Sequence, residues 1–485
     1  NHPGAAVTKR LGLPPLSGVQ VRFFKRRKVE PRFPPSFQRT GDYLFLKGDL
    51  DMNGKAISIG ILGMGTVGTG VARALLEQRE LLTNRTGLVF NLKTVVDVNW
   101  DRERNLDLSS VKTSTNAEDV LGDEEIDIVV ETIGGIEPAA TFIRTAFSRR
   151  KHVVTANKAL IAKCGRELFA LAQKNNVELM FEASVGGGIP IIKGLREGLV
   201  ANRFLSIYGI VNGTSNYILT RMHQDNLSFQ EALQQAQAKG YAEADPTLDV
   251  GGGDAAHKLA ILGSLAQGAI VDLERIPVEG ITEITPMDIE FAKSFGYVIK
   301  LLAICRLRHG KLDLRVHPTL VPNKHLLAAV NEEKNAIFVT GDFVGDTMFY
   351  GPGAGEKPTA SAIVSDIVDL SRDIFLRGGE HFNSRNIDPH RTAELVPTYE
   401  ISNRYYIRLF TKDAPGILSK ISGVLGEQGI SISSVVQLES QGEDGYVPIV
   451  LLTHEAPETA MDSALATIGK FDFVHPELLR LRLFA

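Results

Sequence analysis

A glycine-rich turn between an apolar strand and a helix constrains the fold of this chain more than any other feature. Residues 56–78 read AISIGILGMGTVGTGVARALLEQ, and the turn has the spacing G-x-G-x-x-G, formed by Gly63, Gly65 and Gly68. The first glycine permits the tight turn, the second lets the backbone approach a pyrophosphate, and the third lets the helix pack on the strand. The motif predicts a dinucleotide-binding domain, with Thr66 and Val67 at the helix start beside the phosphates.

Three further apolar runs predict additional strands of the same sheet: LKTVVDVNW, EEIDIVVETIGG and KHVVTANKAL. Ligands of open α/β sheets lie beyond the carboxyl ends of the strands, which places Thr132 and Lys158 near the cofactor. Asp97 ends the second strand and suits the ribose 2′-hydroxyl of NAD, whereas Arg102 or Arg104 suits the 2′-phosphate of NADP. The sequence leaves the choice between the two cofactors open.

An acidic run that ends in a lysine stands at residues 240–258, GYAEADPTLDVGGGDAAHK. Asp254 and Lys258 are four residues apart on a helix predicted over 254–270, so they share one helical face. A solvated acidic loop would not need GGGD leading directly into the apolar pattern LAILGSLA. Helices are also expected at 213–223 and 228–239. A second glycine-rich stretch, GPGAG at 351–355, precedes a helix and is of a kind that returns to cover a cofactor.

The C-terminal block alternates strands and helices. A strand in YYIRLFTK is followed by an Asp-Ala-Pro-Gly turn, an amphipathic helix and a strand in ISISSVVQ. GYVPIVLLTHEA supplies a further strand, and PETAMDSALATIG a second helix. This order is the βαββαβ pattern of a ferredoxin-like module, which we expect over residues 403–480.

Composition limits the functional classes. With 485 residues the chain is long enough for two to four domains, and its net charge of −4 gives no electrostatic case for binding nucleic acid or an acidic membrane. No run approaches the roughly 18 apolar residues of a spanning helix. Two distant cysteines, Cys164 and Cys305, fit packing in a reducing compartment, and we expect a cytoplasmic protein. Residues 1–51 are basic and rich in proline, which opposes an amphipathic leader helix. We expect them to be a disordered or non-native extension.

The motifs together resemble homoserine dehydrogenase. The resemblance rests on GILGMGTVG, TANKAL, FEASVGGGIPII, NGTSNYIL, the 240–258 run and GPGAG, and the block containing TKDAPGIL resembles an ACT regulatory domain. It implies an α/β protein with a Rossmann-type domain at 55–185, completed by 345–375. A substrate-binding, catalytic and dimerisation α+β domain would occupy 186–344, and the ACT domain 403–480. The reaction implied is the NAD- or NADP-dependent interconversion of L-homoserine and L-aspartate 4-semialdehyde, in the biosynthesis of threonine, methionine and isoleucine.

The resemblance also implies roles for single residues. Lys258 matches the family's proton donor, with Lys158 and Asp254 beside it in catalysis. The substrate contacts implied are Glu243, Asp249, Asp254 and Lys158. The cofactor contacts implied are Gly63, Gly65, Thr66, Val67, Gly68, Thr132, Lys158, Gly240 and Gly355. A monovalent cation such as Na⁺ would be held at Glu182, Val185, Gly187 and Ile189, by carboxylate and main-chain oxygens.

Regulation and assembly follow from the ACT resemblance. Asp413 and Gly416 lie at a strand-to-helix junction where an amino acid can bind, and threonine is the expected effector, with methionine or no effector as alternatives. We expect the protein to assemble as a homodimer or homotetramer. We also expect a truncated chain that ends near Val396 to stay active but to be insensitive to threonine.

Two other functional classes stay open at this stage. A semialdehyde dehydrogenase that forms a thioester needs an activated cysteine beside a histidine, and neither cysteine has that setting in the sequence. A non-catalytic amino-acid sensor on a Rossmann scaffold would be expected to lack some of the catalytic residues, all of which are present.

Overall fold

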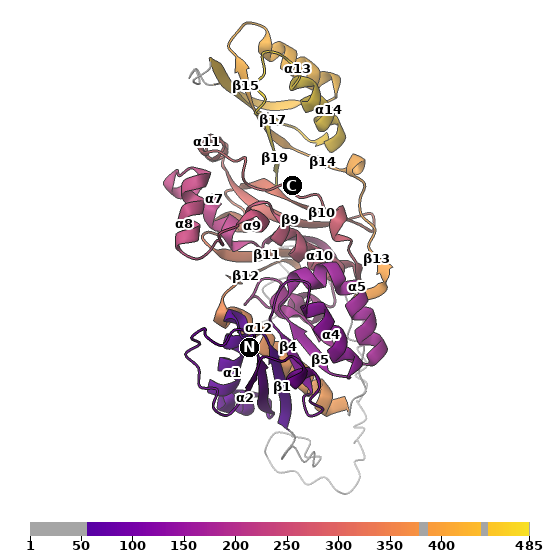
Figure 1. Ribbon diagram of the computed structural model, residues 1–485. Helices are drawn as coiled ribbons and strands as arrows, with labels where there is room; N and C mark the ends of the chain where they lie inside the picture. The colour runs from indigo at the N-terminus through magenta and orange to yellow at the C-terminus, as the bar shows by residue number, and fades with distance from the viewer. Residues whose placement is uncertain (1–55, 378–386, 438–444, 485) are drawn as a thin grey trace, which may run out of the picture. The chain divides into compact units, whose positions relative to one another are not determined.

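The computed structural model describes residues 56–377, 387–437 and 445–484. The expectation for residues 1–51 concerns a segment outside these ranges. The described residues form an α/β fold with a parallel sheet at the N-terminal side and a larger sheet built from the middle and the C-terminal part of the chain (Figure 1).

The first sheet has six strands in the order β3-β2-β1-β4-β5-β6, and every neighbouring pair is parallel. Its strands are β1 (Ala56–Leu62), β2 (Val89–Val96), β3 (Lys112–Ser114), β4 (Ile128–Glu131), β5 (His152–Thr155) and β6 (Leu179–Met180). Its helices are α1 (Thr66–Glu77), α2 (Arg79–Thr86), α3 (Glu118–Leu121), α4 (Ala139–Ser148) and α5 (Lys158–Asn175). The strand order 3-2-1-4-5-6 is that of a Rossmann dinucleotide-binding domain, as the sequence predicted.

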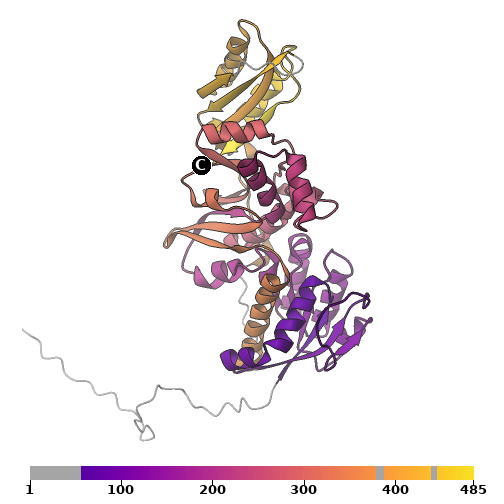
Figure 2. The ribbon, with the colours of Figure 1, turned by 90° about the vertical axis from the view of Figure 1, so that its left-hand side faces the viewer.

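Helix α12 (Glu356–Arg377) returns to this domain and lies beside α1 (Figures 1 and 2). Ile363, Ile367 and Leu370 of α12 are buried in the same core as Val71 and Leu75 of α1. The strand before it, β12 (Gly345–Pro352), pairs instead with the larger sheet. The segment expected to complete the Rossmann domain, 345–375, therefore divides at Pro352. Its strand residues pair with an antiparallel neighbour in the larger sheet, whereas the helix after them packs on the apolar core of the Rossmann domain.

The larger sheet has nine strands in the order β12-β11-β7-β9-β10-β19-β15-β17-β16. Its first half contains β7 (Phe204–Ile210), β9 (Tyr297–Arg308), β10 (Lys311–Pro322) and β11 (Lys334–Gly341). The helices of this region are α6 (Ile191–Lys193), α7 (Gly213–Asp225), α8 (Phe229–Ala238), α9 (Thr247–Val250), α10 (Gly253–Gln267) and α11 (Pro286–Ser294). Short strands β8 (Ala269–Ile270) and β13 (Asp388–Thr392) form a separate parallel pair.

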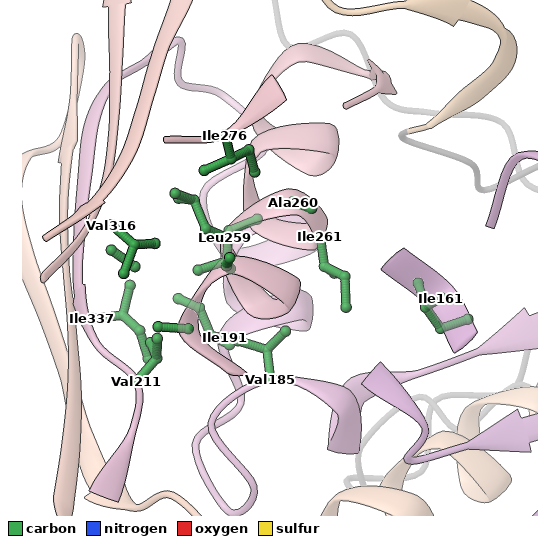
Figure 3. Close-up of a cluster of buried hydrophobic side chains, with 14 of the residues drawn as sticks. Ile161, Val185, Ile191, Val211, Leu259, Ala260, Ile261, Ile276, Val316 and Ile337 are labelled. Atoms are coloured by element: carbon green, nitrogen blue, oxygen red, sulfur yellow. The ribbon is translucent and has the colours of Figure 1, made fainter. Parts of the chain in front are cut away.

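Helix α10 runs through the core of the middle region (Figure 3). Leu259 lies on the side of Val316 in β10, whereas Ile261 lies on the side of Ile161 in α5, so the helix is covered on both sides (Figure 3). All of its residues from Asp254 to Leu265 are buried. A helix buried on every side is expected to be apolar, so a carboxylate and an ammonium group at Asp254 and Lys258 are a marked exception.

The C-terminal module contains β15 (Tyr405–Lys412), α13 (Ile417–Glu427), β16 (Ile432–Gln437), β17 (Tyr446–Thr453), α14 (Glu458–Ile468) and β19 (Leu479–Leu483), with β14 (Ser402–Asn403) and β18 (Ala456–Pro457) pairing beside them. Its four main strands lie in the order β19-β15-β17-β16 and are antiparallel, as in a ferredoxin-like ACT domain. Strand β19 also pairs in parallel with β10, joining Thr319 to Arg482 and Leu320 to Leu483. The module thus continues the sheet of the catalytic region, which the sequence did not predict.

None of the helices in the described ranges combines the length and the apolar character needed to cross a lipid bilayer.

Candidate active site

The turn between β1 and α1 assigns a separate structural role to each of its three glycines. Gly63 has a φ of +97°, and a side chain there would come within 2.9 Å of the Thr132 backbone. A Cβ on Gly68 would lie 1.9 Å from the Gly63 carbonyl oxygen, so this glycine allows the helix to contact the turn. A Cβ atom at Gly65 would have no described atom within 4 Å, apart from those of the adjacent residues in the chain. The backbone at Gly65 is therefore open for the close approach of a ligand.

Residues predicted beside this turn are tied into it. The Thr132 hydroxyl donates to the Gly63 carbonyl oxygen at 2.7 Å. Thr66 is the first residue of α1 and is exposed, whereas Val67 is half-buried and packs against the apolar core. The first turn of α1, residues 66–69, carries no acidic side chain. The Thr69 N–H donates to the Gly65 carbonyl oxygen, so the N–H groups before it and the positive dipole end are the ones available for phosphate.

The structure separates the three charged residues that left the cofactor choice open. Asp97 accepts from the backbone N–H groups of Met64 at 2.7 Å and Asn99 at 2.9 Å. Arg104 is largely buried beside it, with an N···O distance of 3.4 Å, and donates to the Met64 carbonyl oxygen. Both side chains therefore shape the turn itself. Arg102 is exposed and donates to the Thr66 hydroxyl at 3.1 Å, which brings its charge to the start of α1.

A cavity of about 530 Å³ lies where the Rossmann domain meets the middle region. Its walls come from segments far apart in the sequence, namely α5, the loop before α7, the 239–249 stretch, α10 and the 352–355 turn. It is lined by Lys158, Asn212, Gly213, Thr214, Lys239, Gly240, Tyr241, Glu243, Asp249, Asp254, Lys258, Glu333, Asn335, Pro352, Gly353, Ala354 and Gly355. The structure thus brings together every substrate contact expected from the sequence, and Gly240 and Gly355 with them.

Two lysines share one carboxylate at the centre of this cavity. Lys258 Nζ donates to Asp254 Oδ2 at 2.7 Å and to the Val211 carbonyl oxygen at 2.6 Å. Lys158 Nζ lies 3.0 Å from the other oxygen, Asp254 Oδ1. The side chain of Lys158 is 38% exposed and that of Lys258 only 10%, so Lys158 is the more accessible of the two from solvent. We call Asp249, Asp254, Lys158 and Lys258 the acid–lysine cluster.

Burial and charge give the members of the cluster different pKa values. Burial lowers the pKa of Lys258, although Asp254 acts in the opposite direction. Burial also opposes the charge of Lys158, but the attraction of Asp254 outweighs it and raises the pKa of this lysine. Asp254 is buried too, yet the two lysines hold its pKa below the ordinary value, whereas burial raises the pKa of Asp249. Lys258 is therefore the lysine suited to exchanging a proton, and Lys158 a fixed positive charge.

One residue that the sequence analysis missed connects the two acids. Asn212 donates from Nδ2 to Asp249 at 2.7 Å and to Asp254 at 2.8 Å, while its Oδ1 accepts from the Ser215 N–H and caps helix α7. Thr214 donates to the Tyr241 carbonyl oxygen at 2.6 Å and lies 3.3 Å from Asp249. The sequence signal was the N-cap asparagine at the end of the β7 segment.

In the turn at 182–189, the Glu182 carboxylate is held in place through backbone hydrogen bonds. Both oxygens of Glu182 accept backbone N–H groups, from Ile192 at 2.9 Å and Lys193 at 2.8 Å. In the described ranges, no three His, Cys, Asp or Glu side chains gather as a metal-binding group. A Cβ on Gly187 would lie 2.5 Å from the Gly353 carbonyl oxygen, so the turn supports the cavity wall at 352–355. Val185 and Ile189 are buried in the core beside it. The Glu182 carboxylate is thus fixed in position by the start of helix α6.

The remaining residues singled out in the sequence lie away from the cavity. Gly416 has a φ of +89° and stands at the N-terminus of α13, and Asp413 is exposed just before it. Cys305 is buried in β9, where burial raises the pKa of its thiol to about 12. Burial raises the pKa of Cys164 as well. Neither thiol has the lowered pKa of a catalytic nucleophile.

Models of known protein families match three parts of the chain. The model described as "Homoserine dehydrogenase, NAD binding domain" matches residues 63–182, and the one described as "Homoserine dehydrogenase" matches residues 190–368. The model of the ACT domain matches residues 405–469.

Whole-chain comparisons agree with these matches. The chain is 41% identical over 420 residues to homoserine dehydrogenase from Bacillus subtilis, covering 87% of this chain and 96% of the relative. It is also 41% identical to homoserine dehydrogenase from Pseudomonas aeruginosa, covering 88% and 99%. A crystal structure of a homoserine dehydrogenase from Thiobacillus denitrificans superposes with a TM-score of 0.84 at 44% identity, covering 89% and 98%. A hyperthermophilic archaeal homoserine dehydrogenase in complex with NADPH reaches a TM-score of 0.55 at 27% identity, covering 65% and 98%.

Proposed function

Since the chain belongs to the homoserine dehydrogenase family, we propose that it interconverts L-homoserine and L-aspartate 4-semialdehyde with a nicotinamide cofactor. The observation that carries this proposal is the acid–lysine cluster, in which Lys258 and Lys158 share Asp254 inside one cavity with Gly240 and Gly355. A sensor without catalysis has no need of two lysines with opposed pKa shifts. A thioester mechanism is disfavoured by the raised thiol pKa values of Cys164 and Cys305.

The acids suit the amino-acid end of the substrate. Homoserine carries an α-ammonium group, and Glu243 and Asp249 offer carboxylates on the cavity wall to receive it. Asp254 is held by both lysines and by Asn212, so its main role is to fix the position and charge of Lys258. Lys158 provides a positive charge for the substrate's carboxylate or for the oxygen on which negative charge develops.

Lys258 is proposed to move the proton. The nicotinamide, when bound, supplies the hydride to the aldehyde carbon or accepts it from the alcohol carbon. In reduction, the Lys258 ammonium donates a proton to the carbonyl oxygen as its C=O bond becomes a C–O bond. In oxidation, neutral Lys258 takes the hydroxyl proton while the C–H electron pair leaves with the hydride. The lowered pKa of Lys258 makes its ammonium a better proton donor than an ordinary lysine.

NADP is the cofactor that the charges near the turn favour. Asp97 already accepts two backbone N–H groups, which reduces its capacity for a ribose hydroxyl. Arg102 is exposed beside Thr66 and carries the charge that a 2′-phosphate needs. The structure of the archaeal homoserine dehydrogenase is a complex with NADPH, which agrees with this choice of cofactor. A monovalent cation at residues 182–189 would be held by main-chain carbonyl oxygens together with the Glu182 carboxylate, each of whose oxygens accepts one backbone N–H group. No catalytic step depends on it.

The direct test is a spectrophotometric assay with purified chain, L-homoserine and NADP or NAD. Formation of reduced nicotinamide is expected with wild type, and the substitution Asp254→Asn is expected to weaken turnover and homoserine binding together. Asp462, an exposed acid of the C-terminal module that does not line the cavity, provides a matched control as Asp462→Asn. If wild type oxidises no homoserine with either cofactor, the proposed function is wrong.

Feedback by threonine at the C-terminal module is the second part of the proposal. Asp413 and the start of α13 at Gly416 offer an acceptor for an ammonium group and N–H donors for a carboxylate. We propose a homodimer or homotetramer as the assembly, since ACT modules commonly pair across subunits, and its mass is measurable by light scattering. Threonine is expected to inhibit wild type and to act more weakly on Asp413→Asn.

The chain ending near Val396 is a poorer test of this regulation than the sequence suggested. Such a truncation removes β19, which pairs with β10 and places Arg482 against the catalytic region. It also removes Phe484, whose ring lies 4.6 Å from that of Tyr208 on the sheet. Loss of activity in the truncated chain would therefore report damage to the sheet as well as loss of the effector site.

A further inference from the structure

The last strand of the C-terminal module grips an acid of the catalytic region. Arg482 of β19 donates to Glu279 through two parallel hydrogen bonds, from Nη1 to Oε2 at 2.7 Å and from Nη2 to Oε1 at 2.8 Å. Arg480 adds a longer contact to Glu279 Oε1 at 3.3 Å. On its other side Arg482 is bound by Glu458 of α14, with Nε 3.1 Å from Oε1. The guanidinium is therefore fixed between the module and Glu279.

Glu279 belongs to a short segment that runs beside β10. Its backbone N–H donates to the Val316 carbonyl oxygen at 2.8 Å, and the Val316 N–H donates to the Pro277 carbonyl oxygen at 2.9 Å. Two residues further on, the Ile281 N–H donates to the Val250 carbonyl oxygen at 2.8 Å. The segment 278–281 thus links the ion pair between Arg482 and Glu279 directly to the C-terminal end of helix α9.

Glycines make this contact close. A Cβ on Gly280 would lie 2.4 Å from the Val250 carbonyl oxygen and 2.8 Å from Gly251 Cα. Gly252 has a φ of +84°, and a Cβ there would lie 2.9 Å from a methyl carbon of Val278. Because the backbone is closely packed at these positions, a displacement of residues 278–281 also displaces residues 250–252.

Residues 250–252 stand between the two acids of the cavity. Asp249 immediately precedes them, and α10 with Asp254 in its first turn follows them at Gly253. The Asp249 carbonyl oxygen accepts from the Ser215 hydroxyl at 3.0 Å, so the turn is also anchored to helix α7. The separation of the two carboxylates therefore depends on the conformation of a glycine turn that Glu279's segment supports.

We propose that Glu279 is a positioning residue for substrate binding: held by Arg482, it keeps residues 278–281 against the 250–252 turn and thereby sets the placement of Asp249 and Asp254. This inference rests on the proposed function, because it takes Asp249 to be a substrate contact and Asp254 to hold Lys258. It also gives the C-terminal module a physical route to the cavity, through strand β19.

A role in stability alone predicts a different result. If Glu279 and Arg482 only docked the module, removing the charge of Glu279 would lower the melting temperature and leave the KM of the folded enzyme unchanged. If Glu279 positions the acids, the KM for homoserine rises while the cofactor turn, which lies in another domain, keeps its affinity. Comparing the change in the KM for homoserine with the change in the KM for NADP therefore distinguishes the two roles of Glu279.

The test compares full-length Glu279→Gln with wild type and with Asp462→Asn. Asp462 forms an ion pair with Arg480, which lies on the same strand as Arg482. Asp462 is not bonded to Glu279, so Asp462→Asn controls for the loss of an acid at the surface of the module. For Glu279→Gln we expect the KM for homoserine to rise about tenfold, within the range of coupling between sites. The KM for NADP is expected to stay near its wild-type value, and so are all constants of Asp462→Asn.

A double-mutant cycle completes the experiment. Arg482→Gln should raise the KM for homoserine similarly, and the double variant should add little, because the two residues act as one contact. Additive effects, or an unchanged KM in Glu279→Gln, would overturn the inference. Wild type measured alongside separates the two proposals: if it oxidises no homoserine with either cofactor, the proposed function fails. If wild type is active while the KM of Glu279→Gln for homoserine is unchanged, only the inference fails.

Discussion

The dinucleotide turn and the acid–lysine cluster recognise their ligands by opposite means. At the turn, three glycines within residues 63–68 leave backbone N–H groups open, and the side chains nearby mainly shape the loop. In the cluster, charged side chains from α5, α9 and α10 converge on one buried carboxylate. The turn is therefore sensitive to added bulk and the cluster to lost charge.

This difference also separates what each region does in the reaction. The turn holds a cofactor that carries its own chemistry, so a preformed shape is sufficient. The cluster must hold a small zwitterion and move a proton, which requires groups with distinct pKa values. Substitutions chosen in the two regions should accordingly change different kinetic constants.

The largest effect is expected for Lys258→Ala. Loss of the proton-transferring group should lower kcat by roughly 10²-fold or more, with little change in NADP affinity measured by titration calorimetry. Lys258→Arg keeps the positive charge but cannot release a proton at neutral pH, so it should be impaired in a similar way.

The matched control is Lys174→Ala, which removes an exposed lysine from α5. Its kcat should equal that of wild type. Turnover of Lys258→Ala close to wild type would remove Lys258 from its role and would shift the proton transfer to Lys158, the other lysine bound to Asp254.

The turn should respond to Gly65→Val by losing cofactor. The backbone at Gly65 has a φ of −69° and a ψ of −161°, which valine can adopt, and the space above it is free of described atoms. The fold should therefore survive, while the branched side chain blocks the approach of the pyrophosphate and leaves N–H groups unpaired. We expect the Kd for NADP to rise about tenfold or more.

Gly423→Val makes the same change on helix α13, where a built Cβ also meets open space. It should leave NADP binding unchanged. Equal affinities of Gly65→Val and wild type would contradict the placement of the cofactor at this turn.

The contrast between the two regions also explains what the sequence could predict. The Rossmann strands, the glycine turn and the βαββαβ order are encoded in consecutive residues, so their periodicity and punctuation predict them. The strands β9 and β11 and the edge strand β12 were missed, as was the pairing of β19 with β10. Strand pairing between residues 319 and 482 is a long-range contact that no local pattern records.

The site divides in the same way. Residues 240–258 predicted a cluster of acids around Lys258, because acids and lysine stand in one run. Lys158 was expected near the cofactor and, by family resemblance, among the substrate contacts, but neither its sharing of Asp254 nor the bridging role of Asn212 was predicted. The sequence also did not reveal that the backbone N–H groups of Ile192 and Lys193 bind the two oxygens of the Glu182 carboxylate.

A pH profile examines the charges of the cluster directly. Oxidation of homoserine needs neutral Lys258, so kcat in that direction should rise with pH through the pKa of this lysine. Burial lowers that pKa and the Asp254 carboxylate raises it, so removing the carboxylate should lower it further. Asp254→Asn is therefore expected to move the rising limb of kcat to lower pH by about one unit or more, the effect of a neighbouring opposite charge. A limb that stays in place, or moves to higher pH, would mean that another group titrates.

The smallest effect is expected for Arg102→Gln, the one charged side chain proposed to refine the backbone recognition at the turn. Arg102 is exposed beside Thr66, and an exposed charge pair contributes up to ~1 kcal/mol, which corresponds to about a fivefold change in affinity. The KM for NADP should therefore rise about fivefold, while the KM for NAD, which lacks the 2′-phosphate, stays the same. Arg79→Gln removes another exposed arginine of this domain and should alter neither constant. Raising the salt concentration should shrink the difference between wild type and Arg102→Gln for NADP, since exposed charges are screened. A parallel loss with both cofactors would instead assign Arg102 to the shared pyrophosphate, and a wild-type preference for NAD would exclude it from cofactor selection.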